Sequence, residues 1–318
     1  MTILSASTPI AMLIVSVILV SSRSNSESLV CPAGYPEQGI PIDDGDIDLL
    51  QFAENLEHLE AEYFLWGALG YGLDRVAPQL VMGGPPPIGV QKANLDPITT
   101  NIIQEFGLQE VAHLRALKTT VGGFPRPLMD LGAMNFAKLM DSAFGYELEP
   151  AFDPYRDSLS YMIGSYVVPY VGLVSYVGTN PNLVGYVTKR LLSGLLGVEA
   201  GQDAVIREYL YQRAAEVVHP YNHTVAEFTV RISALRNRLA ACGIKDEGLV
   251  VPSSLGAENR TETNVLSADY NSLSYSRTPP EILRTVYATG DEHVPGGFFP
   301  HGGNGKIARA FIRELNKP

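Results

Sequence analysis

Apolar residues recur every three to four positions in several long segments of the chain, which is the spacing of an amphipathic α-helix. The clearest segment covers residues 97–121. Its apolar face carries Ile102, Phe106, Leu117 and Val121. Between Phe106 and Leu117 the same face carries Glu110 and His113. A carboxylate and an imidazole on an apolar face must be paired, neutralised or bound to a metal, because burying an isolated charge costs on the order of several kcal/mol.

Two other predicted helices also carry polar groups on their apolar faces. In a helix predicted over 46–70, Glu57 lies on the apolar face, and Glu60 is a nearby alternative. In a helix predicted over 182–215, Glu199 and Gln202 stand where a second Glu-x-x-His pair would stand. Glu-x-x-His on one helix is half of what a carboxylate-bridged metal site in a four-helix bundle requires. The pattern therefore predicts that three helices point carboxylates toward a common axis.

The remaining segments predict the connections and one further core helix. A helix over 157–177 is apolar almost all round, and Pro169 in its middle should kink it, because proline lacks an N–H and clashes with the carbonyl of Ser165. We expect Asp46 or Asp48 to cap the first helix, which should end near Gly70. Further helices are predicted over 131–144, 224–241, 280–288 and 305–315. The segment 83–89 should be a non-helical connection. Asp96 and Pro97 should be the N-cap and the first residue of the helix over 97–121.

Four stretches carry a resemblance to a known family. They are Asn55-Leu-Glu-His-Leu-Glu-Ala-Glu-Tyr63, Gln109-Glu-Val-Ala-His113, Gly197-Val-Glu-Ala-Gly-Gln202, and the tail from Arg277-Thr-Pro-Pro-Glu-Ile through Asp291-Glu-His-Val-Pro-Gly-Gly-Phe-Phe-Pro300. With them the chain resembles the ferritin-like superfamily, in the branch of plant desiccation-related proteins of the PCC13-62 type. The resemblance implies an all-α, ferritin-like four-helix bundle over 46–215 with a long crossover. An additional helix and an irregular C-terminal extension over 216–318 should pack on that bundle.

The resemblance also implies a metal site. The candidate ligands are Glu57, Glu110, His113, Glu199 and Gln202. In the family pattern the third bundle helix supplies a further glutamate, but Pro169 stands at that place, so one ligand is missing. The negative charge of three carboxylates is smaller than the positive charge of two divalent ions, so we expect one bound ion. Glu60 and Asp203 are substitutes for one of the candidate ligands. One nitrogen and several oxygens favour Mn²⁺ or Fe²⁺.

The functional expectation is a secreted, stress-associated metal-binding protein, with removal of oxygen radicals or peroxide as its activity if it has one. The alternative is a protective or structural cell-wall protein whose metal site has decayed, with the carboxylates protonated or hydrogen-bonded to tyrosines. The sequence identifies no catalytic residue. The expected partners are the metal ion and either further copies of the chain or cell-wall components.

The N-terminus and two further sequence features predict export. An apolar run of eleven residues, Ile10 to Val20, fits a signal peptide over 1–26, followed by an extended leader over 27–45, and a retained anchor is the alternative. Asn222 and Asn259 begin glycosylation sequons. The two cysteines, Cys31 and Cys242, could form a disulfide in an oxidising compartment, or remain two buried thiols.

The other charged and titratable residues predict less. The net charge of −11 and the scattered Lys and Arg residues argue against a nucleic-acid partner. His58, His219 and His223 are expected at the surface. His293 and His301 lie in a glycine-rich segment, which we interpret as a flap rather than as a second metal site.

Overall fold

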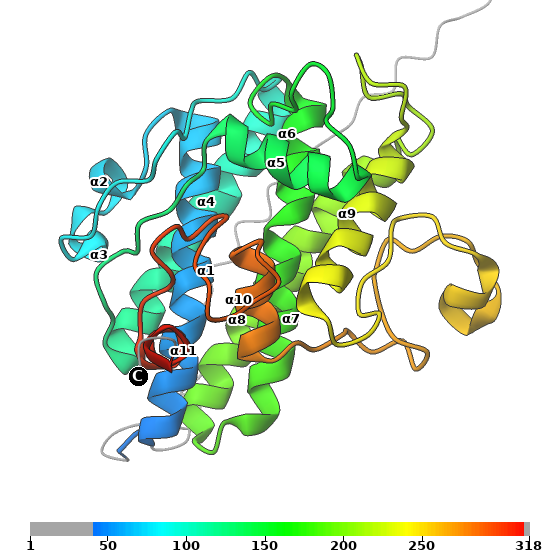
Figure 1. Cartoon of the computed structure of the whole chain (residues 1–318). Coiled ribbons are helices and arrows are strands. Elements are labelled where there is room, and N and C mark those ends of the chain that lie inside the picture. The colour runs from blue at the N-terminus through cyan, green and yellow to red at the C-terminus, as the bar shows by residue number, and fades with distance from the viewer. Residues whose placement is uncertain (1–40, 315–318) are drawn as a thin grey trace, which may run out of the picture. The chain divides into compact units, whose positions relative to one another are not determined.

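The computed structural model describes residues 41–314, and in that range it contains helices and isolated bridges but no β-strand. Four long helical elements form a bundle (Figure 1). They are α1 (Asp44–Leu69), α4 (Pro97–Val121), the consecutive pair α6 (Ser158–Val167) and α7 (Pro169–Thr179), and α8 (Tyr186–Tyr211). The predicted all-α bundle is confirmed. The predicted signal peptide, most of the predicted leader and Cys31 lie outside the described residues.

The directions of the helices follow from which residues meet. Helices α1 and α4 are antiparallel, because Leu65 near the end of α1 lies against Gly107 in the first half of α4, whereas Glu57 meets His113 in the second half. A Cβ at position 107 would come within 2.9 Å of the Leu65 backbone nitrogen. Glycine at this position therefore lets the two helices approach closely.

The α6–α7 pair is also antiparallel to α1, since Tyr161 of α6 donates a hydrogen bond to the carbonyl of Tyr63 and Tyr176 of α7 donates to Glu57. Helix α8 is parallel to α1, because Thr188 near its start donates to Asp46 near the start of α1. Helices α4 and α6–α7 consequently run in the same direction. The segment between them must return along the bundle, which is the long crossover that the sequence predicted.

One predicted cap is wrong. The N-cap of α1 is Asp43, whose side chain accepts from the N–H of Gly45, and neither Asp46 nor Asp48 caps this helix. Asp46 is buried, and its carboxylate accepts from the N–H groups of Val184 and Gly185 at 2.9 and 2.8 Å, just before α8 begins. Burial alone would raise the pKa of Asp46, but these bonds and the bond from Thr188 hold it below its ordinary value. Asp46 therefore joins the start of α1 to the start of α8.

The predicted interruption at Pro169 is present. Helix α6 ends at Val167, Val168 lies between the two helices with its N–H bonded to the carbonyl of Ser165, and Pro169 is the first residue of α7. The stretch Ser158–Asn182 is long and apolar enough to cross a membrane by length and composition, but nearly all of its most apolar window is buried within the protein. The α6–α7 pair is therefore apolar on nearly all sides because it is packed within the protein, and it is not amphipathic.

Shorter elements cover the bundle. They are α2 (Leu73–Val76), α3 (Pro78–Val81), α5 (Ala133–Phe144), α9 (Val225–Ala240), α10 (Pro279–Val286), α11 (Lys306–Glu314), and the 3-10 helices η1 (Asn180–Asn182), η2 (Ser253–Leu255) and η3 (Ala257–Asn259). Helix α9 begins with a Thr224–Glu227 capping box and ends at a left-handed Ala241, in agreement with the predicted bounds 224–241. The C-terminal segment returns to the bundle, where the N–H of Asn304 donates to Asn55 of α1 at 2.6 Å.

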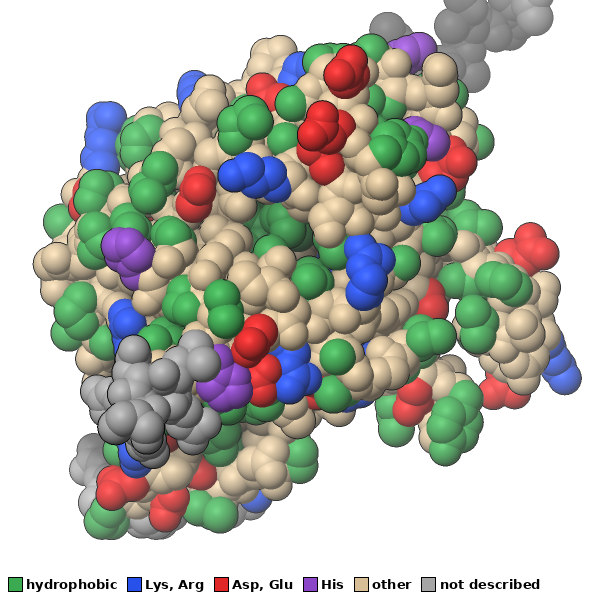
Figure 2. Space-filling model, in the orientation of Figure 1, with side chains coloured by type: hydrophobic (Ala, Val, Ile, Leu, Met, Phe, Trp, Pro, Cys, Tyr) green, Lys and Arg blue, Asp and Glu red, His purple; other side chains and the backbone are tan. Residues whose placement is uncertain are grey.

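The surface is mixed in charge on the face drawn in Figure 2, where Lys and Arg side chains lie singly among acidic and apolar ones. This face shows no continuous basic patch of the kind that phosphate backbones bind.

We expect Asp46→Ala to destabilise the protein by about 1–2 kcal/mol, because it removes the acceptor for two backbone N–H groups and a hydroxyl at the start of α8. Asp48→Ala is the matched control. Its carboxylate pairs with Lys306, whose side chain is 73% exposed, and such solvent-exposed pairs contribute little to stability. Urea denaturation followed by circular dichroism gives both values, and equal losses for the two variants would contradict the assignment.

Candidate metal centre

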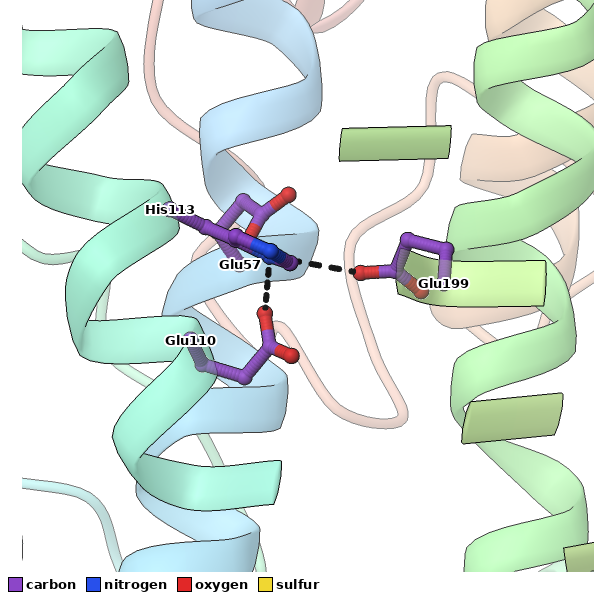
Figure 3. Close-up of side chains that lie close together, drawn as sticks. All are labelled: Glu57, Glu110, His113 and Glu199. Atoms are coloured by element: carbon purple, nitrogen blue, oxygen red, sulfur yellow. Dashed lines mark hydrogen bonds and ion pairs between the residues drawn. The ribbon is translucent and has the colours of Figure 1, made fainter. Parts of the chain in front are cut away.

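Four polar side chains from three helices meet in the middle of the bundle (Figure 3). Glu57 comes from α1, Glu110 and His113 from α4, and Glu199 from α8. One ligand atom of each lies within 4.8 Å of the others. The convergence depends on the helical period, since Glu110 and His113 are three residues apart and share the face of α4 that looks toward α1 and α8.

The imidazole of His113 is at the centre of this group. Its Nδ1 lies 3.1 Å from a carboxylate oxygen of Glu57, 3.0 Å from one of Glu110 and 3.8 Å from Oε1 of Glu199. Three carboxylates therefore face one nitrogen atom. A single N–H cannot satisfy all three, so the arrangement has more acceptors than the imidazole can serve.

All four side chains are buried, with exposed fractions of 0% for Glu110 and Glu199, 1% for Glu57 and 7% for His113. Glu57 also accepts a hydrogen bond from the hydroxyl of Tyr176 on α7. By contrast, neither oxygen of Glu199 has a hydrogen-bond donor among the described residues. Buried carboxylates normally accept several hydrogen bonds, so the missing donors leave room for a cation.

Burial and the charges within this group raise the pKa values of His113 and Glu110 and lower that of Glu57. Burial opposes the charge on His113, but the Glu57 carboxylate and the hydrogen bonds to Glu110 and Glu57 raise its pKa to about 11. Burial would likewise raise the pKa of Glu57, but the charge of His113 and the hydrogen bonds that Glu57 receives hold it below its ordinary value. Burial, with the nearby charge of Glu57, raises the pKa of Glu110 to about 8. Without metal, an ionised Glu57–His113 pair thus faces a protonated Glu110 at neutral pH.

Gln202, predicted as a ligand, lies at the edge of this group. Its amide nitrogen donates to Oε1 of Glu110 at 2.5 Å and to the side-chain oxygen of Gln109 at 3.1 Å, while its own oxygen has no donor among the described residues. Asp203, the other substitute from α8, lies 4.0 Å from the guanidinium of Arg207. Burial raises the pKa of Asp203 to about 6 although the charge of Arg207 opposes this.

The third bundle helix approaches the carboxylates at a different residue from the one the sequence indicated. A Cβ at Gly172 would lie 2.8 Å from Oε1 of Glu60 and 3.2 Å from Oε2 of Glu199, whereas Pro169 starts the helix one turn earlier. Gly172, one turn after Pro169, is thus the backbone of α7 that lies next to Glu60 and Glu199. The side chain that α7 directs at the site is the phenol of Tyr176, four residues after Gly172.

The prediction that His58 lies at the surface is wrong. Its side chain is fully buried and lies 3.6 Å from Glu54, which pairs with Lys118 at 2.8 Å. The four-residue spacing of Glu54 and His58 is a signal that could have placed them together on one side of α1. His219 is exposed and His223 is partly exposed, as predicted.

The other candidate residues lie elsewhere. Asp291, Glu292 and His293 form a second group of possible ligands, but it is partly exposed, and Arg284 pairs with Glu292. Cys242 is exposed at the end of α9, and because Cys31 lies outside the described residues their pairing stays a prediction. Asn222 and Asn259 are both exposed.

Glu57, Glu110, His113 and Glu199 could hold a metal ion, and their chemistry fits one. One imidazole nitrogen with several carboxylate oxygens is a donor set for Mn²⁺ or Fe²⁺, and the group contains no thiolate that would favour a softer metal. The oxygens of Glu199 that lack donors are the observation in the structure that supports a cation at this place.

Comparison with known proteins agrees with this architecture. A family model described as a ferritin-like domain matches residues 45–212, the part of the chain that supplies all four residues. The ferritin-like catalase Nec2 of Nesocodon mauritianus is 72% identical over 271 residues, which cover 85% of this chain and 87% of that protein. The desiccation-related protein PCC13-62 of Craterostigma plantagineum is 51% identical over 282 residues, which cover 88% and 90% of the two chains. No solved structure matches the chain.

We expect the metal-free protein to lose stability as the pH rises from 5 to 8. The pKa of Glu110 is about 8 in the folded protein against an ordinary value of 4.5, so the folded state keeps a proton that the unfolded chain has released. Stability is full below the ordinary value and falls as the pH rises toward 8, by up to about 1.4 kcal/mol per pH unit for this one group. Thermal melts with a chelator present measure the slope.

Glu110→Gln, which imitates the protonated side chain, should make this slope shallower. Glu105→Gln, on the exposed side of the same helix, should leave it unchanged. A metal-free protein whose melting temperature rises over this pH range, or a Glu110→Gln variant with the wild-type slope, would show that Glu110 is not held protonated.

Proposed function

The chain belongs to the ferritin-like family, in its desiccation-related branch, and from this premise we propose that it is a secreted protein that binds Mn²⁺ or Fe²⁺ in its buried centre and decomposes hydrogen peroxide. The observation that carries the metal part of the proposal is the position of His113. Its Nδ1 faces three buried carboxylates. The two oxygens of one of them, Glu199, have no hydrogen-bond donor among the described residues.

The proposed reaction converts two molecules of hydrogen peroxide into two of water and one of dioxygen. One peroxide is reduced by two electrons and takes up two protons, and the other is oxidised by two electrons and releases two. A metal held by Glu57, Glu110, His113 and Glu199 would supply the redox change for the transfer of electrons between the two peroxides. The relative named as a ferritin-like catalase, at 72% identity, supports this reaction over other uses of the metal.

The chain's own residues would hold the ion and accept the protons that the reaction releases. Glu57, Glu110, His113 and Glu199 are the ligands, and Tyr176 orients Glu57 by donating to its Oε1. The side chain of Glu199 can accept a proton that the oxidised peroxide releases, since its oxygens have no other donor among the described residues. The buried setting keeps bulk water from the site and strengthens these interactions.

Peroxide would enter beside Gln109. This residue lines a surface depression of about 520 Å³ on the outer side of α4, together with Gln104, Leu108 and Ala112. It also accepts the hydrogen bond from Gln202, which in turn donates to Glu110. The two amides thus connect the depression to the buried centre by hydrogen bonds, which supports entry of a small polar substrate at this place.

Secretion is part of the proposal. It is supported by the apolar run from Ile10 to Val20 and by the two sequons, since Asn222 and Asn259 are both exposed and accessible to a glycosyltransferase.

A second candidate function is protection without catalysis. The observation in its favour is that the ionised Glu57–His113 pair and the Tyr176 hydroxyl already satisfy much of the cluster in the absence of metal. The relative PCC13-62 is named a desiccation-related protein, which agrees with either function.

We expect His113→Ala to abolish both metal binding and peroxide decomposition, because it removes the nitrogen that faces all three carboxylates. Gln202→Ala should weaken metal binding only slightly, because a neutral amide contributes no charge. Elemental analysis of the purified mature protein gives the metal content, and an oxygen electrode gives turnover with hydrogen peroxide. Gln202→His adds a nitrogen ligand and should raise the affinity.

The outcomes separate the two functions. Stoichiometric metal without oxygen evolution would favour storage or protection, and equal metal contents of wild type and His113→Ala would exclude the ligand assignment. A wild-type melt that a chelator does not shift would favour the decayed site.

A further inference from the structure

A tyrosine, a histidine and a glutamate that take no part in the metal centre meet where α5 packs against α9. Tyr146 follows the end of α5, His223 comes just before α9, and Glu227 lies in the first turn of α9. The packing of the two helices brings Tyr146 and His223 together although they are 77 positions apart in the sequence (Figure 1).

The two nitrogens of the His223 ring face different partners. The hydroxyl of Tyr146 lies 2.5 Å from Nε2, and Oε1 of Glu227 lies 3.7 Å from Nδ1. A carboxylate beside Nδ1 favours the tautomer that carries its N–H there, because the positive end of the N–H then faces the negative charge. Nε2 is then an acceptor, and the hydroxyl of Tyr146 donates to it.

The surroundings hold this arrangement in place. The ring centroid of His223 lies 4.7 Å from that of Phe144 and 6.5 Å from that of Phe228, and both phenylalanines are buried. Glu227 is fixed by the capping box, in which its Oε2 accepts from the N–H of Thr224 at 2.7 Å. This hydrogen bond holds the pKa of Glu227 below its ordinary value, so the side chain stays ionised.

Tyr146 also differs from the other tyrosines in being both accessible and paired with a base. It is 50% exposed, whereas tyrosines of the bundle such as Tyr161 and Tyr176 are buried. Tyr270 is more accessible, at 93%, but its hydroxyl has no hydrogen-bond partner among the described residues. A small molecule can therefore reach both Tyr146 and Tyr270, and only Tyr146 has an imidazole beside its hydroxyl.

A base at this position changes the chemistry of the phenol. A phenol that loses one electron becomes a strong acid, so its oxidation is easier when a hydrogen-bonded base takes the proton in the same step. A reactive hydroxyl, a base and a third group that orients the base are the arrangement by which proteins activate such side chains. The carboxylate of Glu227 also stabilises the imidazolium that forms.

We propose that Tyr146, with His223 as its base, is a site of one-electron oxidation at which the protein becomes covalently coupled to a second phenol. This modification uses neither the metal ligands nor peroxide, so it goes beyond the proposed function.

The coupling proceeds in two stages. A one-electron oxidant takes an electron from Tyr146 while the hydroxyl proton passes to Nε2 of His223. The resulting radical joins the radical of the second phenol through a ring carbon of each, and the new carbon–carbon bond replaces one ring hydrogen on each partner. Both hydroxyls end protonated, so each coupling releases two electrons, which the oxidant takes, and two protons.

The test measures where a small phenol becomes attached. The full purified protein is mixed in air with biotin-labelled tyramide and a laccase, which takes single electrons from phenols. Two couplings supply the four electrons and four protons that convert one dioxygen into two waters, so the protein's own reaction with peroxide does not interfere. Proteolytic digestion and mass spectrometry give the adduct at each tyrosine. We expect more adduct at Tyr146 than at the more exposed Tyr270.

Two variants separate the base from its surroundings. His223→Gln keeps a hydrogen-bond acceptor that cannot take the proton, and His223→Phe keeps an aromatic ring at this place. In each, the adduct at Tyr146 relative to that at Tyr270 should fall by about tenfold or more. His219→Phe is the matched control, because it changes an exposed histidine that has no described contact with Tyr146, and it should leave the ratio unchanged. Circular dichroism confirms that each variant keeps its helices.

Three results would overturn the proposal. More adduct at Tyr270 than at Tyr146 in the wild type would show that exposure alone decides the site. A wild-type ratio in His223→Gln would show that the imidazole does not act as a base. An equal fall in His219→Phe would show that the effect is not specific to His223. None of these results bears on metal binding or peroxide decomposition.

Discussion

The organisation of this protein depends on the burial of carboxylates in the middle of an otherwise apolar bundle. Glu57, Glu110 and Glu199 are almost completely buried, and without metal a single imidazolium is the positive charge closest to them. The cluster therefore keeps its protons on some members, raising the pKa values of Glu110 and Glu199 by burial and by mutual repulsion, while Glu57 stays ionised beside His113. A bundle that only needed to be stable would place apolar residues here. So many buried carboxylates at one level of the bundle form a group that could hold a metal ion.

Much of the fold could be predicted from the sequence, because most of its signals are local. The Asp96–Pro97 start and the left-handed Gly70 end were readable from single residues, and so was the break at Pro169. The convergence of Glu57, Glu110 and Glu199 followed from the helical period, although the ferritin-like arrangement of the helices came from the resemblance. Asp46 was assigned to the wrong helix because its partners lie about 140 positions away in the sequence.

The surroundings of α1 could not be predicted for a related reason. Every residue from Phe52 to Leu65 is buried, so this helix has no solvent-facing side in its middle and its period does not separate an inner face from an outer one. The outer side is covered by segments far away in sequence, with Phe124 near His58 and Asn304 bonded to Asn55. His58 was therefore misplaced, and the choice between Glu57 and Glu60 stayed open. Only the packing of α7 shows that the two glutamates face different neighbours.

The hydrogen bonds of Asp46 also fix the axial alignment of the bundle. Glu57 lies eleven residues after Asp46 on α1, and Glu199 lies eleven residues after Thr188 on the parallel helix α8. Eleven residues are close to three helical turns, a rise of about 16 Å, so each glutamate returns to nearly the same side of its helix as the residue that anchors it. One contact at the end of the bundle thus brings two carboxylates to a common height three turns away. A slip of α8 by a single residue would displace Glu199 by about 1.5 Å and turn it by about 100°, away from the imidazole. Asp46 therefore fixes the relative height of Glu57 and Glu199, although it does not contact either of them.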